Sequence, residues 1–201
     1  LATRIERAFK VELPEQVLAG ASTLRDLLDA LRNATVTVPG DTPVVPPTHW
    51  AEPVQAEPTE VETLVELLDW HVRTHGDRLH IVHLGDGGET QIRYRDLQRH
   101  AHAVAAGLQA HGLEPGQTVA IMLPTCPEYF HAFCGVLRAG GIPVPIYPPA
   151  RLSQIEEHVR RHASILANAQ ASILVTVPEA RGVARLLEAR VAGLRRVLTV
   201  P

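Results

Sequence analysis

The sequence has one lysine, Lys10, against eighteen arginines, and it has only two cysteines and one methionine. Its 19 basic and 22 acidic residues give a formal charge of −3, so it lacks the basic surplus of a nucleic-acid-binding domain, and we expect no nucleic-acid partner. The two arginine pairs, 160–161 and 195–196, fall in helix-like contexts among acidic residues. No stretch approaches about twenty apolar residues without interruption, and no charged-then-apolar segment opens the chain, so we expect neither a membrane span nor a targeting signal.

The two cysteines, Cys126 and Cys134, have a spacing that suits neither a zinc knuckle nor a redox Cys-x-x-Cys pair. Cys126 precedes a proline, and Cys134 falls inside an apolar helical pattern. This context predicts buried, reduced thiols with a structural role, and it is typical of a cytoplasmic protein.

The organisation of the chain is indicated by its prolines. Residues 35–60 contain six prolines and no helical or alternating apolar pattern, which predicts an extended, semi-rigid linker between two units, 1–34 and 61–201. The chain begins at Leu1 and its only methionine is Met122, so we expect that it is cut from a longer polypeptide.

The first unit, 1–34, has the pattern of two short helices. Leu1, Ile5, Ala8 and Phe9 form one apolar stripe, and the stretch 11–14 ends that helix with a proline. Thr23 and Asp26 have the spacing of a capping box that opens a second helix, but two helices this short are marginal by themselves.

The second unit, 61–201, alternates between strands and helices. Its pattern predicts a helix over 64–75, a hairpin of strands 79–84 and 90–94 around the turn 85–88, and an amphipathic helix from Leu97 to Gly112. Beyond these it predicts strands at 119–123, 143–147, 172–176 and 197–200 and helices at 128–139, 151–169 and 179–192. The fold class expected from repeated crossovers of this kind is α/β, a parallel sheet with helices on both faces, preceded by a short all-α segment.

Several polar residues could carry chemistry, and for each a structural reading is favoured. The histidine pairs His71/His75 and His158/His162 are each four apart on a helix, but neither has a third metal ligand in the pattern, and we expect them on solvated faces. The glycine-rich turn 85–88 precedes a strand instead of opening a helix, so it is read as a hairpin turn and not as a phosphate loop. The remaining candidates are Arg151, Trp50 and three aromatic residues. For Arg151 a role in tying the strand exit to the next subdomain is favoured over ligand contact, Trp50 could dock from the linker onto a domain, and Tyr129, Phe130 and Phe133 are expected in the core.

Three segments of the second unit resemble the motifs of adenylate-forming enzymes. Residues 137–149, LRAGGIPVPIYPP, with the helix after them, resemble the second core motif in the version carried by fatty-acyl-AMP ligases. Residues 92–97 resemble the first core motif, and residues 116–121 resemble the glycine-led strand after it. The resemblance implies a parent enzyme that uses ATP and Mg²⁺ to convert a fatty acid to an acyl-adenylate and then passes the acyl group to a carrier protein.

The first unit is similar to the second half of an acyl carrier protein. The similarity rests on the run from Ile5 to Pro14 and on Thr23, Leu24, Asp26 and Leu27. It implies a carrier, in cis or in trans, whose phosphopantetheine is attached to a Ser upstream of Leu1.

The catalytic machinery of that family is not found in the sequence. The family holds phosphates with a Ser/Thr/Gly-rich loop ending in Lys, yet the only lysine here, Lys10, belongs to the carrier-like unit. We therefore expect no catalytic, cofactor-binding or metal-ligating residue within 1–201, leave substrate-binding residues unassigned, place the active site beyond Pro201, and expect the fragment alone to be inactive. Alternative readings are an acyl-coenzyme A synthetase, a peptide-synthetase adenylation domain, or a non-catalytic module that docks a carrier.

Overall fold

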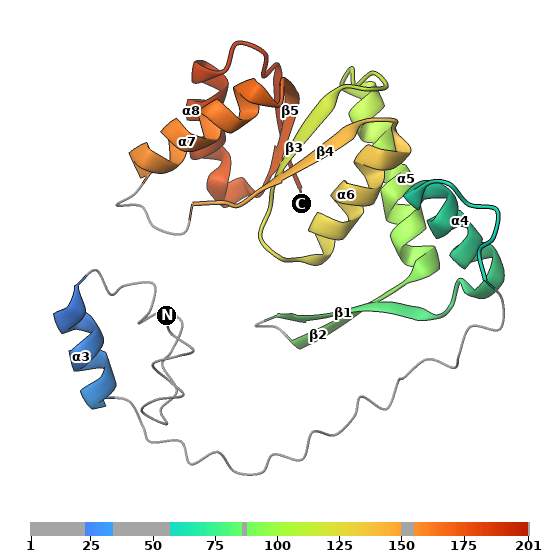
Figure 1. Cartoon of the computed structure of the whole chain (residues 1–201), viewed down its shortest axis with the longest axis horizontal. Coiled ribbons are helices and arrows are strands. Elements are labelled where there is room, and N and C mark those ends of the chain that lie inside the picture. The colour runs from blue at the N-terminus through green and yellow to red at the C-terminus, as the bar shows by residue number, and fades with distance from the viewer. Residues whose placement is uncertain (1–22, 34–56, 86–87, 150–154, 201) are drawn as a thin grey trace. The chain divides into compact units, whose positions relative to one another are not determined.

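The structure, a computed structural model, describes residues 23–33, 57–85, 88–149 and 155–200 (Figure 1). The chain divides into two units, Leu1–Trp50 and Ala51–Pro201, and each is described by itself. The first predicted helix of the carrier-like unit, Trp50, most of the Pro-rich segment and Arg151 lie outside the described residues.

The described part of the first unit is α3, Leu24–Asn33. Its predicted capping box is confirmed: the Asp26 amide donates to Thr23 Oγ1 at 3.2 Å, and the Thr23 amide donates to the Asp26 carboxylate at 2.8 Å. Each side chain thus accepts from a backbone N–H group that the helix itself leaves without an acceptor.

The second unit begins with a helix and a hairpin. Helix α4, Leu64–His75, starts at a second capping box, in which Thr63 and Glu66 exchange hydrogen bonds. Strands β1, Leu79–Gly85, and β2, Gly88–Arg93, pair antiparallel as predicted.

Helix α5, Tyr94–Ala110, succeeds β2 without a loop. The prediction that the strand extends through Tyr94 is wrong, because Tyr94 shares a helical face with Leu97 and Ala101 and the apolar period has already changed at this residue. The Arg95 amide donates to the Gly76 carbonyl at 3.0 Å, which ties the start of α5 to the end of α4.

The larger sheet has four parallel strands in the order β4-β3-β5-β6. The strands are β3, Thr118–Met122; β4, Ile142–Ile146; β5, Ala171–Thr176; and β6, Arg196–Thr199. They alternate with α6, Pro127–Arg138; α7, Ile155–Asn168; and α8, Arg181–Arg190, which comes directly after the 3-10 turn η2, Pro178–Ala180. This is the predicted α/β fold, a parallel sheet with helices on both faces (Figure 1).

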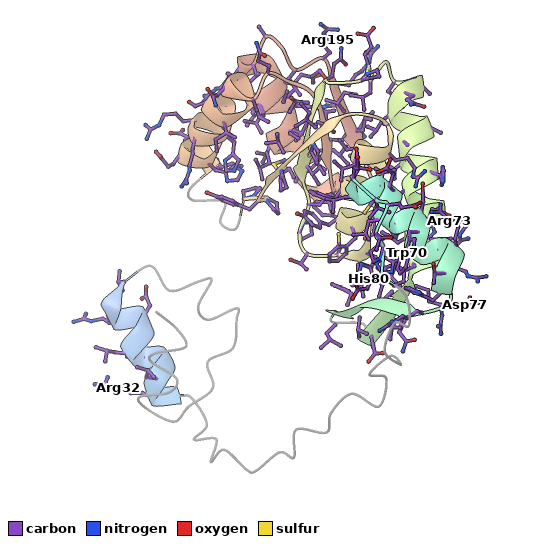
Figure 2. All side chains as sticks on the ribbon, turned by 45° about the vertical axis from the view of Figure 1, so that its right-hand side comes forward. Arg32, Trp70, Arg73, Asp77, His80 and Arg195 are labelled. Atoms are coloured by element: carbon purple, nitrogen blue, oxygen red, sulfur yellow. The ribbon has the colours of Figure 1, made fainter. Side chains whose placement is uncertain are left out.

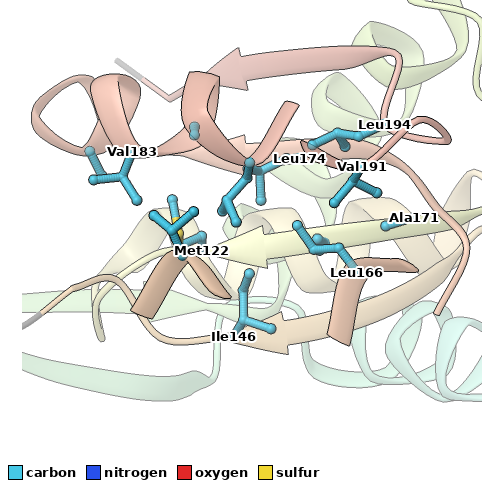
Figure 3. Packing of buried hydrophobic residues seen from close by; sticks show 13 residues of the cluster. Met122, Ile146, Leu166, Ala171, Leu174, Val183, Val191 and Leu194 are labelled. Atoms are coloured by element: carbon cyan, nitrogen blue, oxygen red, sulfur yellow. The ribbon is translucent and has the colours of Figure 1, made fainter. Parts of the chain in front are cut away.

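Side chains that point alternately to the two faces of the central strands contribute to two core clusters. On β3, Val119 and Ile121 face the cluster that includes α5 and α6, whereas Ala120 and Met122 face the cluster that includes α7 and α8 (Figure 3). All four are fully buried. Because β3 is buried on both faces, it reads in the sequence as a continuous apolar run.

Among the described residues β4 is an edge strand of the sheet, and it carries two prolines. The Ile142 amide donates to the Gln117 carbonyl, in the chain that leads into β3. Because successive backbone nitrogens of a strand point to opposite sides, the nitrogens of Pro143 and Pro145 point away from β3. Neither has an N–H group to offer at the open edge, which discourages pairing with a further strand.

The arginine pair Arg195-Arg196 was expected in a helix-like context, and this expectation is wrong. Helix α8 ends at Arg190 because Val191 takes an extended backbone conformation, with φ −115° and ψ 99°. Arg195 lies between the turn at 192–193 and β6, where its amide donates to the Ser172 carbonyl at 2.8 Å, and Arg196 opens β6.

Candidate functional site

A cavity of about 260 Å³ lies between α4, α5, α6 and β1. Its walls are mainly apolar and its polar lining comes from four side chains. The lining residues are Leu64, Val65, Leu67, Leu68, His71, His80, Tyr94, Leu97, Phe133, Cys134, Leu137 and Arg138. Concave, mostly apolar sites with a few convergent polar groups are where small molecules bind most often, so this cavity is the candidate site.

One boundary of the cavity is a stack of three rings from three different elements. Tyr94, the first residue of α5, lies between His71 of α4 and His80 of β1, with ring centroids 4.3 Å and 4.2 Å away. His75 adds a further contact, since its Nε2 lies 2.7 Å from His71 Nδ1. Trp70 of α4, labelled in Figure 2, packs edge-on against both His71 and His75.

A second boundary is a polar tie between three helices. Arg138 of α6 forms an ion pair with Asp69 of α4, and Gln98 of α5 donates to the same carboxylate at 2.7 Å. The Arg138 side chain is only 15% exposed. Its Nε is buried and has no hydrogen-bond partner among the described residues.

The electrostatics of the cavity favour uncharged rings. Burial lowers the pKa of His71, His75 and His80 from the ordinary value, and burial raises the pKa of Tyr94. At neutral pH the three imidazoles and the phenol are therefore uncharged. The guanidinium that lines the cavity, that of Arg138, is balanced by Asp69.

The second histidine pair is buried, so the prediction of a solvated face for His158 and His162 is wrong. His158 is 8% exposed and His162 is fully buried. His162 Nδ1 lies 2.8 Å from the His158 carbonyl, and Tyr147, the residue after β4, packs edge-on against both rings. Along α7 both residues fall on the same face as Val159 and Leu166, and this helical angle, rather than the charged neighbours in sequence, decides their burial.

The other residues singled out from the sequence have structural positions. Tyr129 and Phe133 pack against one core cluster and Phe130 against another, as predicted. Gly85 and Gly88 are the facing ends of the hairpin strands. Cys126 and Cys134 are free and half-buried, and burial raises the pKa of both thiols.

The described residues do not by themselves fit Mg²⁺ and ATP. Within the described ranges no three His, Cys, Asp or Glu side chains converge on one point. The cavity offers one guanidinium already paired with a carboxylate, whereas a triphosphate needs several unpaired cations or backbone donors.

In the described ranges no helix is long and apolar enough to cross a membrane.

Comparison with known proteins places this fold in a family. The description "AMP-binding enzyme" applies to the family that matches residues 68–200. The chain belongs to the AMP-binding enzyme family. The resemblance seen in residues 92–97, 116–121 and 137–149 is therefore confirmed for the family.

Among its relatives is the long-chain-fatty-acid–AMP ligase FadD32 of Mycobacterium marinum, which is 32% identical over 147 residues, 70% of this chain and 23% of that protein. A long-chain-fatty-acid–CoA ligase of Bacillus subtilis is 36% identical over 87 residues, 43% of this chain and 14% of that protein. Triostin synthetase I of Streptomyces triostinicus is 36% identical over 106 residues, 53% of this chain and 19% of that protein. The chain therefore spans less than a quarter of the length of these relatives.

Solved structures agree with this assignment. The fatty acyl-adenylate ligase of Legionella pneumophila, in complex with acyl adenylate and pyrophosphate, matches with a TM-score of 0.58 and 26% identity over 70% of this chain and 23% of that one. The fatty acid AMP ligase of Legionella pneumophila matches with a TM-score of 0.54 and 29% identity over 60% of this chain and 20% of that one.

The cavity itself was not predicted. Its apolar walls are ordinary helix-face residues, and only their packing leaves the space. The available sequence signal was polar: His71 interrupts an apolar helical face, Tyr94 begins one and Arg138 ends one.

Proposed function

We propose that residues 61–201 are the N-terminal part of a ligase that activates a fatty acid. In this reaction a carboxylate displaces pyrophosphate from ATP to give an acyl-adenylate, and a carrier thiol then displaces AMP. The observation that carries the proposal is the likeness of this sheet and its motifs to fatty-acid–AMP ligases over some 70% of the chain.

The role proposed for this part of the enzyme is support. The second-motif residues form the turn at Gly140 and Gly141, the strand β4 and the exit at Tyr147. Gly140 has φ +77°, and a Cβ on Gly141 would lie 3.1 Å from Val136 and 3.2 Å from Leu113, so the motif needs glycine for close packing. We place the groups that bind ATP and Mg²⁺ beyond Pro201.

We further propose that residues 1–34 are the second half of an acyl carrier domain, joined to the ligase by residues 35–60 in a cytoplasmic enzyme. The capping box of α3 supports the helix that this assignment requires. A carrier held in cis experiences an effective concentration in the millimolar range when its tether has a suitable length.

The test is ATP–pyrophosphate exchange with fatty acids of graded length. It is run on the 201-residue chain and on the full translation product of its gene. We expect exchange with the full product and none with the 201-residue chain. Exchange catalysed by the 201-residue chain would show that it already holds the catalytic groups.

A second candidate function is an acyl-coenzyme A or peptide-synthetase adenylation activity. It is supported by the 36% identities to a CoA ligase and to triostin synthetase I. Supplying the full product with either coenzyme A or a phosphopantetheinylated carrier separates the proposed ligase from an acyl-coenzyme A synthetase, because only the ligase loads the carrier alone. Exchange with amino acids in place of fatty acids identifies a peptide-synthetase adenylation domain. A full product without exchange activity but with carrier binding would instead be the non-catalytic docking module.

A further inference from the structure

Helices α5 and α6 pack side by side and run in the same direction (Figure 1). Their register is set by two contacts, Val104 against Gly135 and His100 against His131. In each helix the histidine lies four residues before the other contact residue. The two contacts are therefore about one turn apart along one shared seam between the helices.

Each helix also brings one carboxylate to this seam, about one turn before its histidine. Asp96 lies four residues before His100, and Glu128 lies three residues before His131. Side chains at these spacings share a helix face, with Cβ atoms about 5–6 Å apart. Burial lowers the pKa of His131, whereas both carboxylates act to raise it, so both lie within electrostatic range of its ring.

The two imidazoles already have the spacing of ligands to one metal ion. His100 Nδ1 lies 3.1 Å from His131 Nε2. Two nitrogens bound to a tetrahedral Zn²⁺ ion at about 2.0–2.1 Å are roughly 3.3 Å apart, so the contact has to open only slightly. The proton between the rings then moves to the outer nitrogen of its own ring, and both imidazoles bind in the neutral form. Both histidines and both carboxylates are partly exposed.

The two carboxylates differ in availability. Asp96 is held in an ion pair with Arg99, at 3.3 Å. Glu128 forms no ion pair with any described residue, and its carboxylate lies near the Cys126 thiol, a weak donor that a metal ion can replace. Glu128 must turn from the thiol toward His131 to complete a three-ligand site. This agrees with the absence of three converging ligands in the described ranges.

We propose that His100, His131 and Glu128 bind one Zn²⁺ ion, with water at the fourth position. Two imidazoles and one carboxylate suit zinc and related transition metals, whereas Mg²⁺ prefers oxygen ligands alone. The bound ion ties α5 to the first turns of α6. The proposal does not depend on the proposed ligase activity, because its test measures metal binding alone.

The experiment is titration of the 201-residue chain, without a polyhistidine tag, with Zn²⁺ in competition with a chromophoric chelator. We expect one ion per chain, and a large excess of Mg²⁺ should not displace it. Zn²⁺ should shift the imidazole NMR signals of His100 and His131 and leave those of the exposed His102 in place. Absence of Zn²⁺ binding, or its displacement by Mg²⁺, overturns the proposal.

Substitution of single ligands tests the assignment. His131→Gln and Glu128→Gln should each weaken Zn²⁺ binding at least about tenfold, because losing a ligand costs no less than losing an outer-shell partner. Asp96→Asn should change the affinity by less than about fivefold, the scale of an interaction between exposed charges. Circular dichroism checks that each variant folds. An unchanged affinity in a folded Glu128→Gln variant would rule out the three-ligand site.

The competing location is the other accessible histidine pair, on α4. His71→Gln with His75→Gln removes two imidazoles whose nitrogens lie 2.7 Å apart, and should leave binding of the Zn²⁺ ion unchanged. Loss of binding in this double variant, together with unchanged binding in His131→Gln, would place the ion on α4, against the proposal.

Discussion

His162 stacks on His158 one turn away in α7, with ring centroids 3.8 Å apart and planes inclined by 21°. Both Nε2 atoms are buried without a partner among the described residues. Burial is the main cause that lowers the pKa of His158, and the proximity of His162 adds to it. His158 is therefore accommodated in its uncharged form.

This pair predicts a stability that depends on pH. The folded pKa of His158 lies below the unfolded value of about 6.5, so below that pH the unfolded chain binds more protons. Stability is full above about pH 6.5 and falls as the pH drops through the folded pKa. Urea unfolding should give a smaller free energy of unfolding at pH 5 than at pH 7.5. His158→Phe should reduce this difference.

The control for this experiment is His102→Gln, at an exposed histidine of α5. This variant should leave unchanged the difference between the free energies of unfolding at pH 7.5 and pH 5. A His158→Phe variant with the same pH dependence as the unmodified chain would place the effect on the other histidines with lowered pKa, which are His71, His75, His80 and His131.

The crossing of α5 and α6 predicts opposite effects of one substitution at two glycines. A Cβ on Gly135 would lie 2.5 Å from Val104 Cγ1 and 2.6 Å from Val104 Cβ, so Gly135→Ala should destabilise the unit by about 1–3 kcal/mol. Gly107, in α5, has nothing within 4 Å of its Cβ position, and Gly107→Ala should stabilise by about 0.5–1 kcal/mol. Chemical denaturation measures both, and a stabilising Gly135→Ala would contradict the close approach.

The tie between Asp69 and Arg138 predicts non-additive effects. Asp69→Leu leaves a largely buried guanidinium without its carboxylate and Gln98 without its acceptor, and should cost about 1–3 kcal/mol. Adding Arg138→Met removes the uncompensated charge and should recover most of that loss. A double-mutant cycle measured by urea unfolding decides this, and simple additivity of the two changes would argue against a coupled pair.

The prolines at the β4 edge predict an effect on association. Pro143→Val with Pro145→Val supplies two N–H groups to the open edge, and the double variant should form dimers or larger species as concentration rises. Analytical ultracentrifugation of the double variant beside the unmodified chain gives the answer. Unchanged sedimentation would mean that the prolines do not protect this edge.

Most of the fold can be predicted from local patterns. Continuous apolar runs such as 119–123 predict strands buried on both faces. The three- and four-residue spacing of Leu97, Ala101, Ala105 and Leu108 predicts the face of α5 that packs inward. The capping pair Thr23/Asp26 predicts where α3 begins. These features depend on neighbours in sequence, so the sequence is sufficient to find them.

The features that escape prediction depend on packing across the chain. The ring stack joins residues from α4, β1 and α5, and the polar tie joins Asp69 to Arg138, so neither is visible in any one segment. The burial of His158 could have been predicted from its angular position on the helix. Its charged neighbours in sequence, such as Glu157 and Arg160, instead suggest a solvated helix face.

The smallest core cluster, built on Leu68, Ile92 and Leu97, supports α4 and the hairpin, while the two larger clusters support the parallel sheet. Parts of a protein with few buried apolar groups open more readily than the whole unfolds. Backbone amides of α4 and β1 should therefore exchange with solvent deuterium faster than those of β3 and β5, in a sub-global opening that also empties the cavity. Any molecule held there would raise the protection of α4 and the hairpin before it changed the stability of the sheet.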